Sequence, residues 1–183
     1  IQAVAKKHGR LDGLVNNAAK VTMGDIVNSS DADGRATFAA GADAVFVGTR
    51  AALRVMIPQG SGAIVNISST NGRRAMGYMG AYSASKAALI QFSAVAAMEA
   101  APYGVRVNAL APGMVMTPGN EAFYSQNRDS LAVVEAAIPA KRGGKPSELA
   151  GAIRFLLSDD STYVNGVCLD VDGGKAAQLY MPG

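Results

Sequence analysis

The sequence has almost none of the residues that form disulfides or bind transition metals. It contains one cysteine, Cys168, and one histidine, His8, in 183 residues, and it has no tryptophan. A single cysteine cannot form an internal disulfide, so a disulfide-stabilised secreted fold is excluded and a reducing cytoplasm is expected. His8 and Cys168 stand too far apart in the chain to form a Cys/His motif, so we expect no metal site.

Charged residues are also few, at 17%, and the net charge is +3. The basic residues occur singly or in pairs, without the stripe that nucleic acids or anionic lipids bind. The longest apolar stretch, after Lys86, is interrupted by Gln91 and Glu99 and falls short of the roughly 20 residues of a membrane helix. No signal peptide is recognisable from Ile1 onward. We therefore expect a cytoplasmic protein that binds a small molecule, and neither nucleic acid nor a membrane.

Apolar residues, by contrast, make up 49% of the chain, which is enough for a hydrophobic core in one domain. Short segments rich in Val, Ile and Leu alternate with longer helical patterns, as in parallel sheets buried on both faces. The expected strands are 11–16, 62–68, 105–110 and 167–171, and the expected helices are 30–57, 83–101 and 147–158, the first two ended by Pro58 and Pro102. Residues 117–144, with several Pro and Gly, are expected to form an insertion where open sheets place their ligands. The pattern predicts a doubly wound α/β fold.

Three side chains suit acid–base chemistry. Tyr82 and Lys86 stand four residues apart at the start of a predicted helix, so they lie on one face. A nearby ammonium and the positive end of a helix dipole lower the pKa of a phenol towards that of a useful acid or base. Ser69 closes the preceding strand, 13 residues before Tyr82, where a catalytic hydroxyl is expected. A Tyr–Lys pair alone more often belongs to a solvated helix face.

Further motifs accompany the pair at the other strand ends. They are Asn16-Asn17-Ala18-Ala19, Pro112-Gly113 with Thr117, and Val171-Asp172-Gly173-Gly174. Together with Ser69 and Tyr82-x-x-x-Lys86, these motifs make the sequence similar to the short-chain dehydrogenase/reductase family from about Leu11 to Gly174. Ala19 stands where the family has the glycine of its Asn-Asn-Ala-Gly motif.

The resemblance implies hydride transfer between NAD or NADP and an alcohol or ketone. Tyr82 would donate or accept the proton, Lys86 would lower its pKa and hold the nicotinamide ribose, and Ser69 would hydrogen-bond the substrate oxygen. The cofactor would contact Tyr82 and Lys86, and also Asn17, Ala18, Pro112, Gly113, Val115 and Thr117. Plainer roles exist for some of these residues, since Asn17 could tie strands together and Pro112-Gly113 could only shape a turn.

The sequence departs from the family in having no Gly-x-x-x-Gly-x-Gly loop, which presents backbone amides to the pyrophosphate. We therefore expect residues 1–183 to be the C-terminal two-thirds of a single Rossmann-type domain, whose sheet is incomplete because its first strands are absent. Ile1 to His8 would then end the helix before the family's fourth strand. The absent segment carries the residue that selects NAD or NADP, so that choice stays open. Such a sheet would expose one edge and an apolar face.

Two glycines form a second departure. Gly41 stands where many members have an asparagine that holds a proton-relaying water, and Gly34 stands where the family often has tryptophan. Glycine in a helix interior costs about 1 kcal/mol relative to alanine. If the relay is missing, we expect Gly41→Asn to raise turnover.

The main alternative is a non-catalytic binding or scaffold protein that keeps the fold. The absent phosphate loop and Gly41 favour it, whereas Ser69, Tyr82 and Lys86 oppose it. A hydrolase is disfavoured because the sequence has no Gly-x-Ser-x-Gly elbow. An apolar alcohol or ketone is expected as substrate from a set of Met, Phe and Tyr residues near the site: Met76, Tyr78, Met79, Met114, Met116, Phe123 and Tyr124. The family's tetramers predict a homo-oligomer built through helices 31–57 and 83–101 and through residues 178–183.

Overall fold

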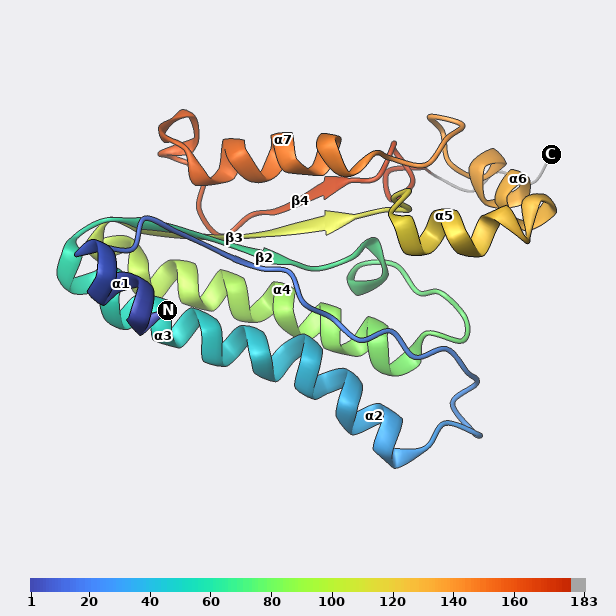
Figure 1. Ribbon diagram of the computed structural model, residues 1–183, viewed down its shortest axis with the longest axis horizontal. Helices are drawn as coiled ribbons and strands as arrows, with labels where there is room; N and C mark the ends of the chain where they lie inside the picture. The colour runs from blue at the N-terminus through green and yellow to red at the C-terminus, as the bar shows by residue number, and fades with distance from the viewer. Residues whose placement is uncertain (179–183) are drawn as a thin grey trace.

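The computed structural model describes residues 1–178 and has a parallel sheet with helices on both faces (Figure 1). Helices α1 (Gln2–His8), α2 (Asp31–Phe38), α3 (Ala44–Gln59) and α4 (Gly80–Ala100) lie on one side, and α7 (Pro146–Leu157) lies on the other. Helices α5 (Pro118–Ser125) and α6 (Arg128–Ala136) lie beyond the end of the third strand. The expected α/β fold is confirmed.

The sheet contains β1 (Gly13–Asn16), β2 (Gly62–Ile67), β3 (Val105–Pro112) and β4 (Cys168–Val171), paired in that order and all parallel. The carboxyl ends of the strands therefore share one edge of the sheet. Strands β2 and β3 are buried along nearly their whole length. Strand β1 pairs only with β2 among the described residues, and Val15 on it is 37% exposed.

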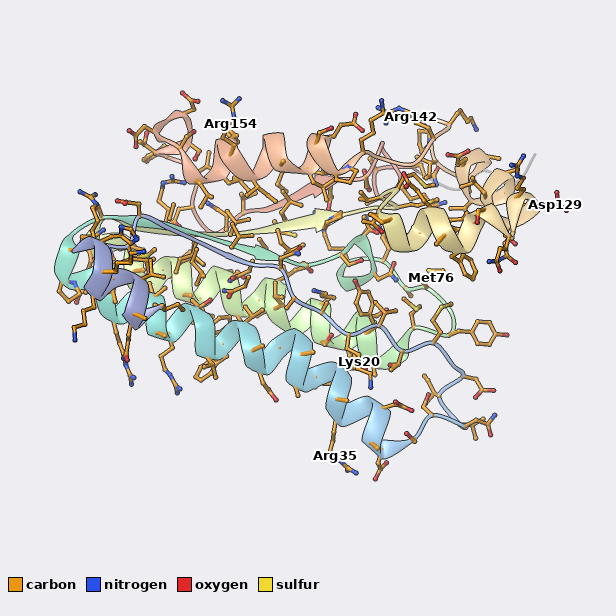
Figure 2. All side chains as sticks on the ribbon, viewed as in Figure 1. Lys20, Arg35, Met76, Asp129, Arg142 and Arg154 are labelled. Atoms are coloured by element: carbon orange, nitrogen blue, oxygen red, sulfur yellow. The ribbon has the colours of Figure 1, made fainter. Side chains whose placement is uncertain are left out.

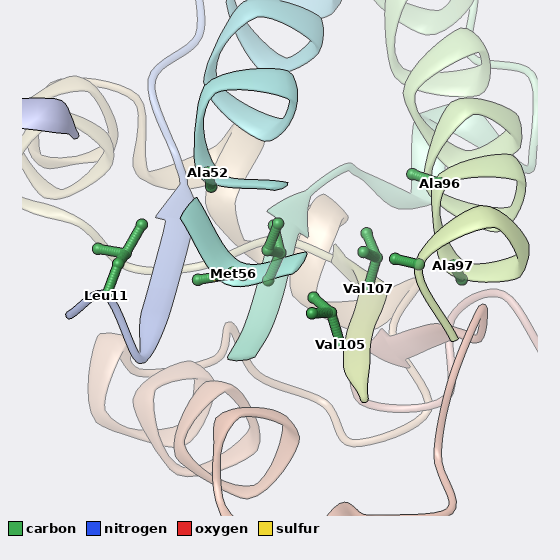
Figure 3. Close-up of a cluster of buried hydrophobic side chains, with 9 residues drawn as sticks. Leu11, Ala52, Met56, Ala96, Ala97, Val105 and Val107 are labelled. Atoms are coloured by element: carbon green, nitrogen blue, oxygen red, sulfur yellow. The ribbon is translucent and has the colours of Figure 1, made fainter. Parts of the chain in front are cut away.

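Small side chains let the helices approach the sheet closely. Figure 3 shows Ala52 and Met56 of α3 and Ala96 and Ala97 of α4 around the strands. This cluster consists of Leu11, Ala52, Met56, Ile64, Ala96, Ala97, Ala100, Val105 and Val107. A second cluster lies under α7 and consists of Val65, Ile67, Leu110 and Leu156. Both faces of the sheet are thus covered by apolar packing, as the alternating pattern predicts.

The element boundaries differ from the sequence prediction in several places. Pro58 does not end its helix but lies in the last turn, because Gly60 in the left-handed conformation (φ 75°) caps α3 after Gln59. Helix α4 begins at Gly80 and not at Ser83, since a hydrogen bond from Ser83 N to Met79 O (2.8 Å) already closes a turn. The middle of the 117–144 segment forms two helices, α5 and α6, and the expected 30–57 helix is divided by a π-helical turn at Ala39–Asp43.

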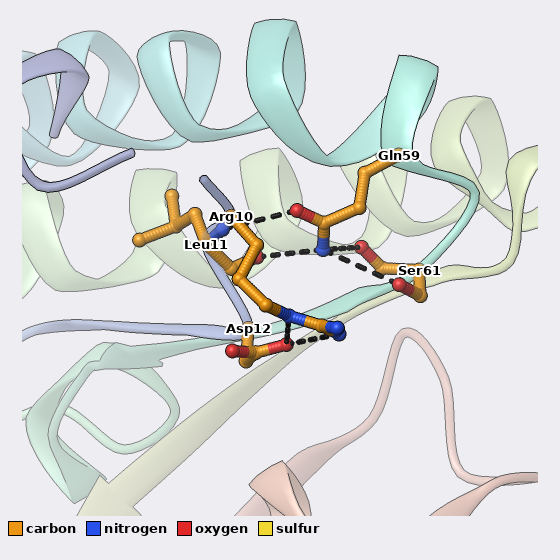
Figure 4. A network of polar contacts seen from close by, with 5 residues as sticks. All are labelled: Arg10, Leu11, Asp12, Gln59 and Ser61. Carbon is orange, nitrogen blue, oxygen red and sulfur yellow. Dashed lines mark hydrogen bonds and ion pairs between the residues drawn. The ribbon is translucent and has the colours of Figure 1, made fainter. Parts of the chain in front are cut away.

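A small polar network closes the amino end of the sheet (Figure 4). The Gln59 side chain accepts from Leu11 N (3.0 Å) and donates to Leu11 O (3.0 Å) and Ser61 O (2.9 Å). Arg10 and Asp12 form an exposed ion pair, 2.6 Å between Nη2 and Oδ1. The amide of Gln59 therefore holds the start of β1 against the loop that enters β2.

Charged side chains project from the outer faces of the helices, with Arg35 pointing away from α2 and Arg154 away from α7 (Figure 2). Within residues 1–178, no helix is long and apolar enough to cross a bilayer. The same residues contain no group of three or more His, Cys, Asp or Glu side chains placed to hold a metal ion. Of the oligomer contact expected at 178–183, all but Gln178 lies outside the described residues.

Candidate active site

One cleft of about 600 Å³ opens at the carboxyl edge of the sheet. It is lined by nearly all of the predicted site residues, namely Asn17, Ser69, Tyr82, Lys86, Pro112, Gly113, Val115 and Thr117. The exception is Ala18, which is exposed and outside this lining. Parallel strands explain the convergence, because each of these segments leaves the sheet at the same edge.

Tyr82 lies in the first turn of α4, half-buried, and shares the cleft with Ser69. Burial raises the pKa of Tyr82 above its ordinary value of 10.0, and the polar Ser69 side chain opposes this rise because it favours the charged form. The phenol is therefore protonated at neutral pH and can serve as a proton donor.

Lys86 is 2% exposed, and its Nζ donates to Ile67 O at 2.7 Å. Its ammonium lies 5.8 Å from the centroid of the Tyr82 ring. Ser68 Oγ donates to Lys86 O (2.9 Å), which attaches this turn of α4 to the end of β2. Burial lowers the pKa of Lys86 from 10.5 to about 8, so the side chain remains mostly cationic at neutral pH. The cleft floor therefore holds a positive charge beside the phenol.

The opposite wall of the cleft follows β3. Gly113 N donates to Val171 O (3.0 Å), which ties the turn to the end of β4. Thr117 Oγ1 accepts from Asn120 N (3.3 Å) and caps α5, and Asn120 Nδ2 donates to Val115 O (2.7 Å). The Thr117 hydroxyl thus has a structural task in addition to any contact with a ligand.

Several lining residues were not anticipated from the sequence. They are Val15, Ala19, Ile67, Ser68, Asn120, Pro146, Leu149, Ala150 and Ile153, whereas Met114, which also lines the cleft, was an expected substrate contact. Four of them lie on α7, and their position depends on how this helix crosses the sheet between β3 and β4, which no local sequence pattern indicates. The other expected apolar contacts do not line this cleft.

A larger hollow of about 810 Å³ lies at the other end of the strands, near Gly62, Val105 and Arg106. Its lining contains none of the predicted site residues. The smaller cleft is therefore the candidate active site, because it contains the side chains that could take part in a reaction.

Gly41 changes one expectation from the sequence. It is buried in the π-helical turn, and a Cβ at this position would lie 2.9 Å from Ser85 Oγ and 3.2 Å from Ser85 Cβ. Ser85 is itself buried and its Oγ donates to Tyr82 O at 2.8 Å. The space that an asparagine needs is thus occupied by α4, and the expected gain in turnover from Gly41→Asn is replaced by an expected loss of stability.

We predict that Gly41→Ala destabilises the fold by about 1–2 kcal/mol, because overpacking here outweighs the gain in helix propensity. Gly34 provides the matched control, since no atom lies within 4 Å of a Cβ placed there. Gly34→Ala should stabilise the protein by about 0.5–1 kcal/mol. Urea denaturation measures the free energy of unfolding of both variants. The same measurement on Gly41→Ala combined with Ser85→Gly tests whether Ser85 causes the loss. Equal stabilisation by the two alanines would show that Ser85 does not crowd Gly41.

Comparison with known proteins agrees with this geometry. The family described as enoyl-(acyl carrier protein) reductase matches residues 1–176. Levodione reductase from Leifsonia aquatica is 34% identical over 185 residues, which cover 97% of this chain and 68% of the reductase. The 3-oxoacyl-(acyl-carrier-protein) reductase FabG from Thermotoga maritima is 38% identical over 174 residues, which cover 95% of this chain and 70% of FabG. The solved structure "ElxO with NADP Bound" superposes with a TM-score of 0.93 at 30% identity, over 97% of this chain and 72% of ElxO.

The chain thus matches relatives of known class over nearly its whole length and has their parallel α/β fold. It belongs to the short-chain dehydrogenase/reductase family of NAD(P)-dependent oxidoreductases.

Proposed function

We propose that the cleft interconverts an alcohol and a ketone by hydride transfer with NAD or NADP, with Tyr82 as the general acid and base. The observation that carries this proposal is the convergence of Ser69, Tyr82 and Lys86 in one cleft. The similarity to levodione reductase and to a 3-oxoacyl-(acyl-carrier-protein) reductase supports a carbonyl or alcohol substrate.

When bound, the nicotinamide supplies or accepts the hydride. The residues present fit its half of the cofactor, because a buried ammonium and a phenol adjoin a wall of backbone and small side chains. We assign Tyr82 and Lys86 to the nicotinamide ribose and Val115 and Thr117 to the carboxamide. We assign Pro112 and Gly113 to contacts beside the carboxamide. Asn17 and Ala18 are assigned to the adenosine side of the cofactor. The pyrophosphate has no glycine-rich loop in this sequence, so the fit extends to one half of the cofactor.

Ser69, Tyr82 and Lys86 each have a separate role in the reaction. The Ser69 hydroxyl hydrogen-bonds the carbonyl oxygen and stabilises the negative charge that develops there. Tyr82 donates its phenolic proton to the same oxygen, and the Lys86 ammonium stabilises the tyrosinate left behind. Burial raises the pKa of Tyr82, so the phenol is in its proton-donating form at neutral pH.

An apolar ketone fits the walls best. Met114, Leu149 and Ile153 supply apolar lining to the cleft. We infer that a small or medium apolar ketone is the substrate class, with polar recognition confined to the reacting oxygen.

We further propose that residues 1–183 act as the C-terminal two-thirds of one Rossmann-type domain. The exposed edge of β1 and the sequence's lack of a phosphate loop support this. The same two features also favour the alternative, a binding or scaffold protein that retains the fold without turnover.

The test is a turnover assay on the isolated protein with NADH and with NADPH, against a series of apolar ketones. We expect ketone-dependent loss of reduced nicotinamide absorbance, together with quantitative alcohol formation. A fluorescence titration runs beside it, because the chain has no tryptophan to obscure bound nicotinamide. Binding without turnover across the series would favour the scaffold alternative over the enzyme.

A further inference from the structure

The segment that carries Ser69 is short and has few bonds of its own. Ser69 precedes a single 3-10 turn, η2 (Thr70–Gly72), and its Oγ accepts from Asn71 N at 3.2 Å. The turn is closed by hydrogen bonds from Gly72 N to Ser69 O (2.9 Å) and from Arg73 N to Thr70 O (3.0 Å). A one-turn segment of this kind depends on its neighbours for its position.

On one side η2 rests on the helix that carries Tyr82 and Lys86. A Cβ on Gly72 would lie 2.8 Å from the carbonyl carbon of Lys86 and 2.9 Å from its oxygen, so the two backbones are in direct contact. Only glycine allows this approach without a shift. This contact fixes how closely η2 approaches α4, but a packing contact of this kind does not fix its orientation.

On the other side the next residue provides that bond. Arg73 Nη1 lies 2.6 Å from Asp170 Oδ2 on β4 and also donates to Cys168 O at 3.4 Å. Asp170 Oδ1 is buried and has no hydrogen-bond partner among residues 1–178. Arg73 is therefore the cation that compensates this half-buried carboxylate.

Strand β4 in turn holds the opposite wall of the cleft. Asp170 is paired in register with Ala111, and the following residue, Val171, accepts the hydrogen bond from Gly113 N. A link from Arg73 to Asp170 thus joins the Ser69 wall to the wall formed by Pro112 and Gly113.

We propose that Arg73, through its ion pair with Asp170, is a positioning residue that holds Ser69 against Tyr82 and fixes the width of the cleft. This role rests on the proposed function, since it assigns Ser69 and Tyr82 to the reaction. The pair is directional and close, whereas within residues 1–178 the side chain of the neighbouring Arg74 donates only to Arg73 O (3.2 Å). Arg74→Met is therefore the matched control for Arg73→Met.

The first readout is hydrogen–deuterium exchange of the peptide that covers residues 69–74. In Arg73→Met we expect at least a fivefold faster exchange of these amides, on the order of that for a loosened surface turn. In Arg74→Met and in Arg73→Lys, which keeps the charge, exchange should stay close to that of the wild type. Unchanged exchange in Arg73→Met overturns the proposal.

The second readout is the ultraviolet titration of Tyr82, obtained as the difference between each protein and its Tyr82→Phe counterpart. Moving Ser69 away from Tyr82 weakens the effect of Ser69 that lowers the pKa of Tyr82, so the titration of Arg73→Met moves to higher pH. A purely structural role would change the unfolding midpoint and leave this titration in place, and that outcome overturns the proposal.

The third readout is turnover, where Arg73→Met should lower kcat by about tenfold or more, with KM changed less than about threefold. Loosened exchange with unchanged kcat overturns the positioning role. If the wild type shows no turnover with either cofactor, the proposed function fails, and the exchange and titration readouts decide on Arg73 by themselves.

Discussion

The Tyr82→Phe variant is expected to reduce ketones about a thousandfold more slowly than the wild type while still binding the nicotinamide cofactor. The substitution removes only the phenolic oxygen, and a positioned general acid contributes about 10²–10⁴ to the rate. The ring remains in the first turn of α4, beside the ammonium of Lys86. Steady-state kinetics give kcat, and fluorescence titration of NADH or NADPH gives the dissociation constant.

Tyr78→Phe is the matched control for this experiment. Tyr78 precedes the same helix, is 69% exposed and lies outside the lining of the cleft. Its loss of a hydroxyl should leave kcat within about twofold, since exposed surface changes are usually small in effect. If Tyr82→Phe keeps more than about a tenth of the wild-type kcat, another group supplies the proton.

The Lys86→Met variant should lose turnover and yet be more stable than the wild type at pH 7, by about 2 kcal/mol. The pKa of Lys86 falls from 10.5 to about 8 on folding, which corresponds to a cost on the order of 3 kcal/mol for the protonated form. Methionine avoids that cost but gives up the 2.7 Å hydrogen bond to Ile67 O, worth about 1 kcal/mol. If the proposed mechanism holds, the charge of Lys86 serves the reaction at the expense of stability.

The pH dependence of stability also tests whether burial of the Lys86 ammonium is the cause of this cost. Between about 8 and 10.5 the unfolded chain binds more protons at this residue than the folded chain does, so the contribution of Lys86 to stability should rise with pH in that window. Below pH 8 both states are protonated and the full cost is present. Cys168 and Tyr82 contribute in the opposite sense, because burial raises their pKa values, so the wild type is compared with Lys86→Met at each pH. Urea denaturation from pH 7 to 10.5 should show the stability advantage of Lys86→Met shrinking as the pH rises. The control is Lys175→Met, which removes an exposed lysine that donates to Ala137 O (2.8 Å). A stability advantage of Lys86→Met that stays constant over this range would assign it to another cause.

The sheet could be predicted because each of its strands is recognisable from its own local sequence. Each strand is a short run of Val, Ile, Leu and Ala between turn residues, and the structure pairs all four in parallel. Helix ends were less predictable, because Pro58 and Gly60 compete as stop signals and the left-handed Gly60 decides. The π-helical turn at Ala39–Asp43 could not be predicted, since an Ala- and Gly-rich sequence is compatible with any type of helix.

The gathering of the site residues could be anticipated, whereas their environments could not. Ser69, Tyr82 and Lys86 follow from the spacing of strand end and helix start. The burial of Lys86, the crowding of Gly41 by Ser85 and the pairing of Arg73 with Asp170 depend on packing between segments far apart in the chain. No local pattern reports such contacts, and each of them changes what a substitution is expected to do.

The most direct test of hydride transfer at this cleft is to follow the hydride itself. The isolated protein is incubated with an apolar ketone and with NADH or NADPH that carries deuterium at both C4 positions, and the alcohol is examined by mass spectrometry. The account predicts one deuterium at the carbinol carbon of the product, and about a thousandfold less labelled alcohol from Tyr82→Phe in the same time. Alcohol without deuterium, or equal amounts of labelled alcohol from the two proteins, would contradict it.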